Sequence, residues 1–138
     1  MLSNTVFIDT GGLIAFLSTR DDYAARAKRV LAELRRRRAV LVTSSAVIFE
    51  LLDGAALRDR RMSAHLHFFL RNFDVEVIHV QSDLLQRAWT FYDERNDKQW
   101  SLTDCVSFVL MDERNIDEAF AHDHHFDQAG FIPSLRHF

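Results

Sequence analysis

The chain has 138 residues, of which 48% are hydrophobic and 27% charged, and its formal net charge is −3. These values predict one globular domain over residues 1–138 and exclude a disordered or uniformly basic, nucleic-acid-coating protein. No apolar run is long enough to cross a membrane. The single cysteine, Cys105, allows no internal disulfide, and the first residues carry no basic leader, so we expect a cytoplasmic protein.

Hydrophobic periodicity in the first half of the chain predicts short buried strands that alternate with amphipathic helices. In chain order these elements are a strand over Thr5–Ile8, a helix over Leu13–Leu17, a helix after Asp21-Asp22, a strand over Ala39–Val42, a helix capped by Thr43-Ser44-Ser45 and a helix over Met62–Phe73. The helix after Asp21-Asp22 has one continuous apolar face, which predicts that it packs on the sheet.

The second half repeats this alternation. In chain order it contains a strand within Val75–Val80, a helix capped by Ser82 or Asp83, a polar loop over Asn96–Trp100, a helix that begins at Ser101, a strand over Ala119–Ala121 and a short edge strand at Phe131-Ile132. The helix after Ser82 is expected to bury Leu85, Ala88, Trp89 and Tyr92. Strands that alternate with helices predict a three-layer α/β sandwich, with a mostly parallel sheet of four to five strands between helices.

Positive charge is carried almost entirely by arginine, since only Lys28 and Lys98 of the 17 basic residues are lysines. Two clusters stand out, Arg35-Arg36-Arg37-Arg38 and Arg58-Asp59-Arg60-Arg61. A solvated helix end accounts for the first cluster, because cations favour the negative pole of the helix dipole. Contact with RNA phosphates is the alternative, since guanidinium groups bind phosphate through two hydrogen bonds.

Four acidic residues lie where apolar segments begin or end, and these are Asp9, Glu50, Asp104 and Asp123. Ligands of open parallel sheets bind beyond the carboxyl ends of the strands, so these side chains are expected to converge there. Two carboxylates about 4 Å apart repel by roughly 4 kcal/mol at an effective dielectric near 20. A fold that gathers several of them is therefore expected to hold a divalent cation.

Each acid also has a purely structural interpretation. Asp9 suits the N-cap of the helix that follows it, Glu50 is an acid among apolar helix neighbours, and Asp104 forms a Ser-x-x-Asp capping box with Ser101. A carboxylate buried among such neighbours needs a partner or a metal.

The last acid, Asp123, lies within His122-Asp123-His124-His125 and competes with Asp127. Zinc is an alternative at this cluster, but adjacent histidines rarely face one ion and no cysteine pair accompanies them. Carboxylate ligation favours Mg²⁺ or Mn²⁺. The histidines are expected to lie at the surface or to support the metal ligands.

Four segments together resemble the PIN-domain ribonucleases, and most closely the VapC-type toxins of bacterial toxin–antitoxin pairs. They are Phe7-Ile8-Asp9-Thr10 with Leu13-Ile14-Ala15, Thr43 to Leu51, Ser101 to Phe108, and Ala119 to Phe126. Each segment alone is a weak match, whereas all four in this order and at these spacings are specific. The resemblance covers nearly the whole chain.

The resemblance implies Mg²⁺- or Mn²⁺-dependent hydrolysis of an RNA phosphodiester. Asp9 and Asp104 would be the principal metal ligands, and Glu50 and Asp123 would hold a second ion or metal-bound waters. Thr10 would stand at the family's small hydroxyl position beside the first acid. Ser101 would support Asp104.

This chain departs from the family pattern before its last acid, where Ala121 or His122 stands instead of a hydroxyl residue. Asp127 is therefore a candidate substitute for the support of Asp123. The resemblance also implies an antitoxin that lays an apolar helix between the early helices and sends a basic side chain into the acidic pocket. A homodimer is implied too, while Arg20 and Arg114 are the candidates for RNA contact at the rim.

Other functions remain in competition. A housekeeping PIN nuclease without an antitoxin would have the same residues, and a non-catalytic PIN-like binding module would be favoured if an acid were missing. Phosphotransfer on an aspartate is a further alternative. It requires an acidic pair after the first strand and a lysine after a late strand, and the chain has neither.

Overall fold

The computed structural model describes residues 3–54 and 59–137. Its strands are β1 (Thr5–Ile8), β2 (Val40–Ser44), β3 (Glu76–Ile78), β4 (Glu118–Phe120) and β5 (Ile132–Pro133). Its helices are α1 (Thr10–Leu17), α2 (Ala24–Arg36), α3 (Ser45–Asp53), α4 (Arg61–Asn72), α5 (Ser82–Glu94), α6 (Leu102–Glu113), α7 (His124–Gln128) and α8 (Ser134–His137). None of the described helices is long and apolar enough to span a membrane.

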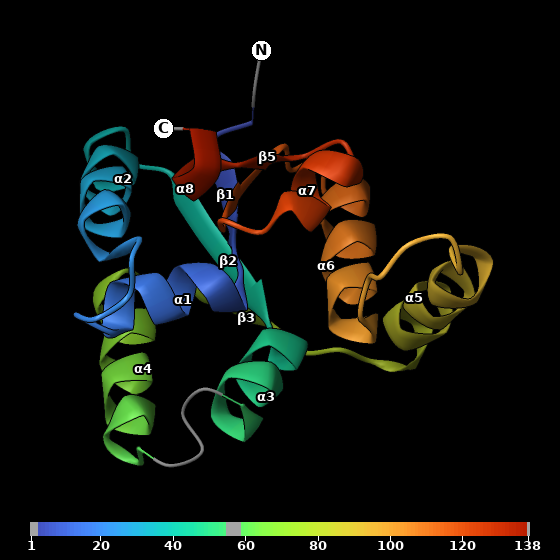
Figure 1. Ribbon diagram of the computed structural model, residues 1–138, viewed down its shortest axis with the longest axis horizontal. Coiled ribbons are helices and arrows are strands. Elements are labelled where there is room, and N and C mark those ends of the chain that lie inside the picture. Colours follow the sequence, from blue (N-terminus) through green and yellow to red (C-terminus); the bar gives the residue numbers. More distant parts are fainter. Residues whose placement is uncertain (1–2, 55–58, 138) are drawn as a thin grey trace.

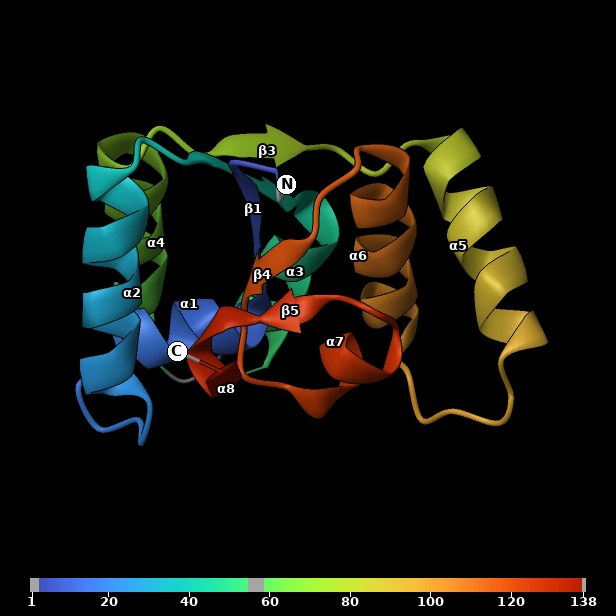
Figure 2. The same cartoon turned by 90° about the horizontal axis from the view of Figure 1, so that it is seen from above.

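The five strands form one sheet in the order β3-β2-β1-β4-β5, and every neighbouring pair is parallel. Figures 1 and 2 show α1, α2 and α4 on one side of this sheet and α6 on the other, with α5 packed on the outer side of α6. The predicted three-layer sandwich with a parallel sheet of four to five strands is therefore confirmed.

The central strand β1 is buried because its side chains are apolar on both faces of the sheet. Val6, Phe7 and Ile8 have no exposed surface, as expected for a parallel strand covered by helices on both sides. Helix α1 packs closely on β4 through Gly12, where a Cβ atom would lie 2.0 Å from the carbonyl oxygen of Phe120. Glycine at this position therefore allows the first helix to approach the sheet.

Two helices differ from the sequence-based expectation. The first begins at Thr10 rather than Leu13, because Asp9 caps it and Gly11-Gly12 is helical. In α5 the buried positions are Leu84 and Ala88, whereas Leu85, Trp89 and Tyr92 are 38%, 53% and 45% exposed. The expectation that these three residues are buried is wrong, because α5 has apolar residues on two adjacent stripes and only one of them faces α6.

The first arginine cluster ends α2, as the helix-end interpretation predicts, and two of its members have partners within the chain. Arg36 pairs with Glu33 at 2.6 Å, and Arg37 pairs with the buried Glu118 at 2.7 Å. In the second cluster Arg61 pairs with Asp59, and Arg58 lies outside the described residues. Intramolecular pairing thus accounts for much of this positive charge.

The two arginines expected at the rim are separated by the fold. Arg20 is exposed in the segment that joins α1 to α2. Arg114 caps the far end of α6 and pairs with Glu76. Because a helix rises 1.5 Å per residue, Arg114 lies about 15 Å along α6 from Asp104, so its placement at the rim of the acidic site is wrong.

Candidate metal site at the carboxyl edge of the sheet

The sheet topology places Asp9 at its centre. The chain runs from β1 to β2 and β3 on one side and returns to β4 on the other, so β1 lies at the topological switch point. Asp9 follows β1 directly, and its backbone N–H donates to the carbonyl oxygen of Phe120 in β4. Ligand sites of parallel sheets are found at this location.

Asp9 is both a helix cap and a strongly perturbed acid. It is 6% exposed, and its Oδ2 accepts a hydrogen bond from the backbone N–H of Gly11 at 3.4 Å. Burial and the neighbouring charges of Asp104 and Glu50 together raise the pKa of Asp9 from 3.8 to about 7. The structure therefore brings Asp104 and Glu50 close enough for their charges to oppose the ionisation of Asp9.

Asp104 is held at the start of α6 by the predicted capping box. The Ser101 hydroxyl oxygen accepts from the Asp104 N–H at 3.0 Å, and Asp104 Oδ2 accepts from the Ser101 N–H at 3.1 Å. The side chain is only 13% exposed. The cap therefore orients Asp104 toward the site, and Ser101 supports it as the resemblance implies.

Asp123 is the N-cap of α7 and is joined to Asp104 by a histidine. Its Oδ1 accepts from the His125 backbone N–H at 2.9 Å. The Nδ1 atom of the same histidine lies 3.1 Å from Asp104 Oδ2 and 3.4 Å from Asp123 Oδ1. Asp123 is thus linked to Asp104 through His125, and it is not among the charges that raise the pKa of Asp9.

Glu50 reaches the cluster from α3, but it is exposed. Its apolar sequence neighbours predicted a buried carboxylate, and this expectation is wrong. The exposed fraction of Phe49 is 68%, whereas Leu51 is fully buried, so the apolar face of α3 turns away from Glu50. Glu50 therefore lies at the rim, where it contributes charge rather than a buried ligand.

The three residues expected to support the acids have different environments. Thr10 is 7% exposed, and its Oγ1 has no hydrogen-bond partner among the described residues. Asp127 contacts His137 at 2.7 Å and Arg136 at 3.3 Å instead of Asp123. The assignment of Asp127 as the support of Asp123 is corrected, because its side chain points to α8 and the position is taken by His125.

The donor set fits a hard divalent cation. The charges of Asp104 and Glu50 raise the pKa of the buried Asp9, and a cation bound at Asp9 would relieve this repulsion. Among the described residues, ligand atoms of three acidic or histidine side chains lie within 4.8 Å of one another only at Asp123, His124 and His125, so Asp9, Asp104 and Glu50 are more widely spaced. That smaller group includes nitrogen donors, which leaves a softer metal as the alternative occupant of the outer side.

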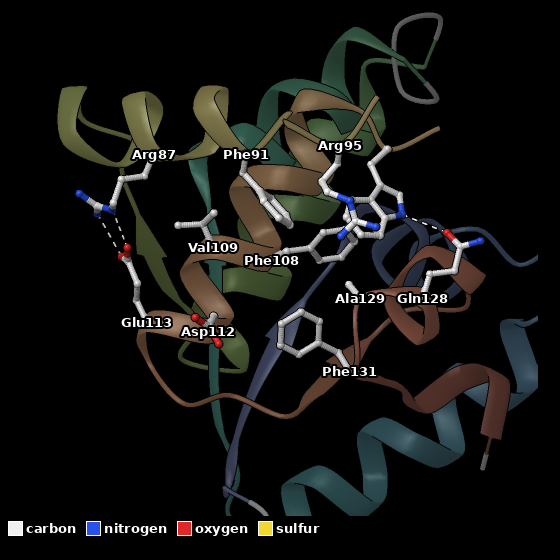
Figure 3. A pocket seen from close by; sticks show the side chains of 11 residues that line it. Arg87, Phe91, Arg95, Phe108, Val109, Asp112, Glu113, Gln128, Ala129 and Phe131 are labelled. Atoms are coloured by element: carbon white, nitrogen blue, oxygen red, sulfur yellow. Dashed lines mark hydrogen bonds and ion pairs between the residues drawn. The ribbon is translucent and has the colours of Figure 1, made fainter. Parts of the chain in front are cut away.

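A groove of about 410 Å³ lies between α5, α6 and the segment from α7 to β5. Figure 3 shows the side chains that line it. The described residues that line it include none of the four acids, so it is separate from the acidic cluster. Within it Trp100 Nε1 donates to Gln128 Oε1 at 3.0 Å. This bond ties the loop before α6 to the end of α7, and these two helices carry Asp104 and Asp123.

Comparison with known proteins places this geometry in a family. The PIN-domain family model matches residues 6–132. The chain belongs to the PIN-domain family. The predicted resemblance is thus confirmed for nearly the whole chain, and the parallel sheet with acids at its carboxyl edge is the PIN fold.

Named relatives of this PIN domain are VapC-type toxins. The chain is 30% identical over 128 residues to the 23S rRNA-specific endonuclease VapC20 of Mycobacterium tuberculosis. The aligned region covers 92% of this chain and 95% of that protein. The crystal structure of this VapC20, a Sarcin-Ricin loop cleaving toxin, matches with a TM-score of 0.83 at 28% identity, over 93% and 97% of the two chains. VapBC2 of Rickettsia felis, solved on a promoter DNA fragment, matches with a TM-score of 0.67 over 93% and 96%; at 15% identity it shows the fold alone.

Sequence analysis did not single out His125 from its neighbours. The spacing of three histidines around Asp123 indicated only a group near the acid. His124 is 57% exposed on its side chain and His125 only 18%, a difference that arises from the way α7 packs. The one local signal was the buried Phe126, which fixes the face of α7 that turns toward α6.

Proposed function

We propose that this PIN domain is a divalent-metal-dependent endoribonuclease and the toxin of a toxin–antitoxin pair. The observation that carries the proposal is the buried Asp9 at the switch point of the sheet, with the charges of Asp104 and Glu50 near enough to raise its pKa to about 7. A site that penalises its own ionised state is suited to binding a cation. Its place at the switch point of a PIN fold and the endonuclease relatives support the nuclease assignment.

In the proposed reaction Asp9 and Asp104 hold Mg²⁺ or Mn²⁺, with Glu50 and Asp123 on the outer side. A cation held there would supply a water of lowered pKa and would neutralise charge on the phosphate. One oxygen of Asp9 accepts a hydrogen bond from a backbone N–H of α1, and one oxygen of Asp104 accepts from the Ser101 N–H. These bonds hold both carboxylates in place while the phosphodiester is positioned. Hydrolysis breaks the P–O bond to one ribose oxygen; the hydroxyl of the water ends on phosphorus, and the other hydrogen of the water ends on the leaving ribose oxygen.

We propose that the substrate is a structured RNA, with 23S rRNA as the first to test. The support is the relatives' specificity for 23S rRNA together with full-length coverage of both chains. Arg20 and Arg60 are exposed and form no ion pair with another described residue, whereas Arg61 pairs with Asp59, so the positive charge open to RNA near α4 and α1 is that of Arg60 and Arg20. The overall charge of −3 makes such local positive charge necessary for RNA binding.

An antitoxin and a homodimer are part of the proposal. Phe49 on α3 and Phe68 on α4 are 68% and 70% exposed, and both helices contact α1. An amphipathic antitoxin helix that covers these rings, with a basic side chain toward Glu50, would restrain the toxin. Phe68→Ser should weaken antitoxin binding in calorimetry without lowering cleavage, and light scattering should give twice the chain mass.

The decisive experiment compares wild type with Asp9→Asn and Asp104→Asn on ribosomal RNA in Mg²⁺ or Mn²⁺. Wild type should cleave at discrete sites, EDTA should stop cleavage, and both variants should lose activity by 100-fold or more, on the order of a catalytic electrostatic group. Lys28→Gln, an exposed change on α2, serves as the matched surface control. Equal cleavage by wild type and both variants would refute the metal-site assignment.

Two alternatives make different predictions in the same experiment. A housekeeping nuclease would cleave RNA and have no antitoxin partner, so co-expression with a neighbouring short reading frame would yield no complex. A non-catalytic binding module would bind RNA without cleaving it in either metal. The presence of all four acids favours an enzyme over that module.

A further inference from the structure

The imidazole of His125 is the one described side chain that contacts two of the four acids. Its Nδ1 lies 3.1 Å from Asp104 Oδ2 and 3.4 Å from Asp123 Oδ1, and its own backbone N–H donates to the same Asp123 oxygen. An atom that faces two carboxylate oxygens must carry a hydrogen, so the tautomer with hydrogen on Nδ1 is required. The ring therefore acts as a shared donor between two acids that otherwise repel.

These contacts leave one oxygen free on each acid. Asp104 Oδ2 accepts from the Ser101 N–H and from His125, and Asp123 Oδ1 accepts from the His125 N–H. Among the described residues no hydrogen bond is directed at Asp104 Oδ1 or Asp123 Oδ2. Each carboxylate thus has one oxygen held by protein donors and the other available to a cation.

Helix α7 contacts α6 and the loop before it through a small number of side chains. It has five residues, which is too short for a helix to be stable on its own. Its polar links to the start of α6 are the contact of His125 with Asp104 and the hydrogen bond between Gln128 and Trp100, while Phe126 packs on Phe108. Of these links, only that of His125 reaches the acids themselves.

We propose that His125 is a positioning residue for the metal site, which sets the separation and orientation of Asp104 and Asp123 through its Nδ1–H. This inference rests on the proposed metal-dependent function. It assigns the imidazole a role as hydrogen-bond donor to the ligands and not as a ligand. Partners of metal ligands in this position typically change metal affinity by about 10–100-fold when they are removed.

Two substitutions of His125 separate the donor from the bulk of the side chain. In His125→Asn the amide is attached at Cγ, so its N–H₂ group occupies the place of Nδ1. In His125→Gln the amide lies one atom further out, at the place of Nε2, and no donor faces the two acids. His67→Gln is the matched control, because His67 is exposed on α4 and its side chain forms no hydrogen bond or ion pair with another described residue.

The measurement is Mn²⁺ affinity, determined from the free Mn²⁺ signal in electron paramagnetic resonance, with melting in EDTA as the check of folding. We expect His125→Gln to bind Mn²⁺ about 10–100-fold more weakly than wild type, while His125→Asn retains most of the affinity. His67→Gln should match wild type. Cleavage rates should follow the affinities at limiting metal and converge at saturating metal.

Four outcomes overturn the inference. Wild-type affinity in His125→Gln would show that the acids need no shared donor. Equal losses in both His125 variants, with preferential Zn²⁺ or Co²⁺ binding by wild type, would make His125 a ligand. Mg²⁺ binding that is present in wild type and absent from both His125 variants would also identify His125 as a ligand. If wild type itself binds no Mn²⁺, the proposed function fails first, and that result is distinct from a failure confined to His125.

A measurement on the unmodified protein keeps the inference testable if His125→Gln does not fold. Long-range ¹H–¹⁵N spectra of the metal-free wild type report which imidazole nitrogen carries hydrogen. We expect His125 to carry it on Nδ1, and a neutral ring with hydrogen only on Nε2 would refute the shared-donor role.

Discussion

Replacement of Asp9 by asparagine is predicted to stabilise the metal-free protein while it abolishes nuclease activity. The pKa of Asp9 is raised from 3.8 to about 7, chiefly by burial and then by Asp104 and Glu50. Since each tenfold change in proton affinity corresponds to 1.36 kcal/mol, ionised Asp9 lowers the free energy of unfolding by about 4 kcal/mol at pH 8. Asparagine removes the charge and retains the cap on α1, because it is as good an N-cap as aspartate.

The pH dependence of this gain has a definite sign. Below about pH 4 Asp9 is protonated in the folded and the unfolded chain, so wild type and Asp9→Asn should have nearly equal stability. Between about pH 4 and pH 7 the unfolded chain releases this proton while the folded chain keeps it, so wild type loses stability relative to the variant. Above pH 7 the difference reaches its full value.

The assay is thermal melting of both proteins in EDTA at pH 4, 6 and 8. For a chain of this length about 1 kcal/mol shifts the melting temperature by roughly 3 °C, so the variant should melt about 10 °C higher at pH 8. Carboxylates far from Asp9 titrate in the same way in both proteins, so the difference in melting temperature between the two proteins is the quantity to compare. A difference that is absent or negative at pH 8, or that does not grow with pH, would refute the assignment of Asp9 as a buried acid opposed by its neighbours.

Three further predictions concern metal binding, the contact of α1 with β4, and the ion pair of Arg37 with Glu118. Millimolar Mg²⁺ or Mn²⁺ should raise the melting temperature of wild type and should release protons at pH 6. The melting temperature of Asp9→Asn should stay unchanged. If the metal shifts neither protein, the non-catalytic module is favoured. Gly12→Ala should cost several kcal/mol in chemical denaturation, because its Cβ would lie 2.0 Å from a carbonyl oxygen of β4. Arg37→Ala should lower the free energy of unfolding by about 2–3 kcal/mol, because it leaves the buried Glu118 unpaired. Arg36→Ala breaks an exposed pair and should lower it by less than about 1 kcal/mol. Equal losses in the two variants would contradict a stabilising buried pair.

The parallel sheet could be predicted from the sequence because its central strand is buried on both faces. Val6, Phe7 and Ile8 form a continuous apolar run, which in a chain of alternating strands and helices indicates a central parallel strand. The same reasoning failed for α5, where Leu84 and Ala88 form one apolar stripe and the exposed residues form the next. Helical periodicity indicates that such a helix is apolar, but the choice between two adjacent stripes is made by the helix it packs against.

The acidic cluster was predictable in its members and less so in their surroundings. Asp9 and Asp104 follow from local signals, a strand end and a capping box, which do not depend on distant residues. Glu50 was expected to be buried because its neighbours along the chain are apolar, yet exposure depends on the neighbours around the helix. His125 meets Asp104 across 21 positions of sequence, so the contact exists only after α7 has packed on α6.

Helix capping and metal binding are complementary roles of these acids and not competing explanations. Asp9 caps α1, Asp104 closes the capping box of α6, and Asp123 caps α7, so three of the four acids lie at helix N-termini. In each case a backbone N–H holds one carboxylate oxygen, which fixes the side chain and leaves the second oxygen for a cation. Alanine at these positions would remove the cap together with the ligand, at a cost of about 1 kcal/mol in the helix alone. Asparagine keeps the cap and removes the charge, and it is therefore the substitution that tests the metal site without disturbing the fold that builds it.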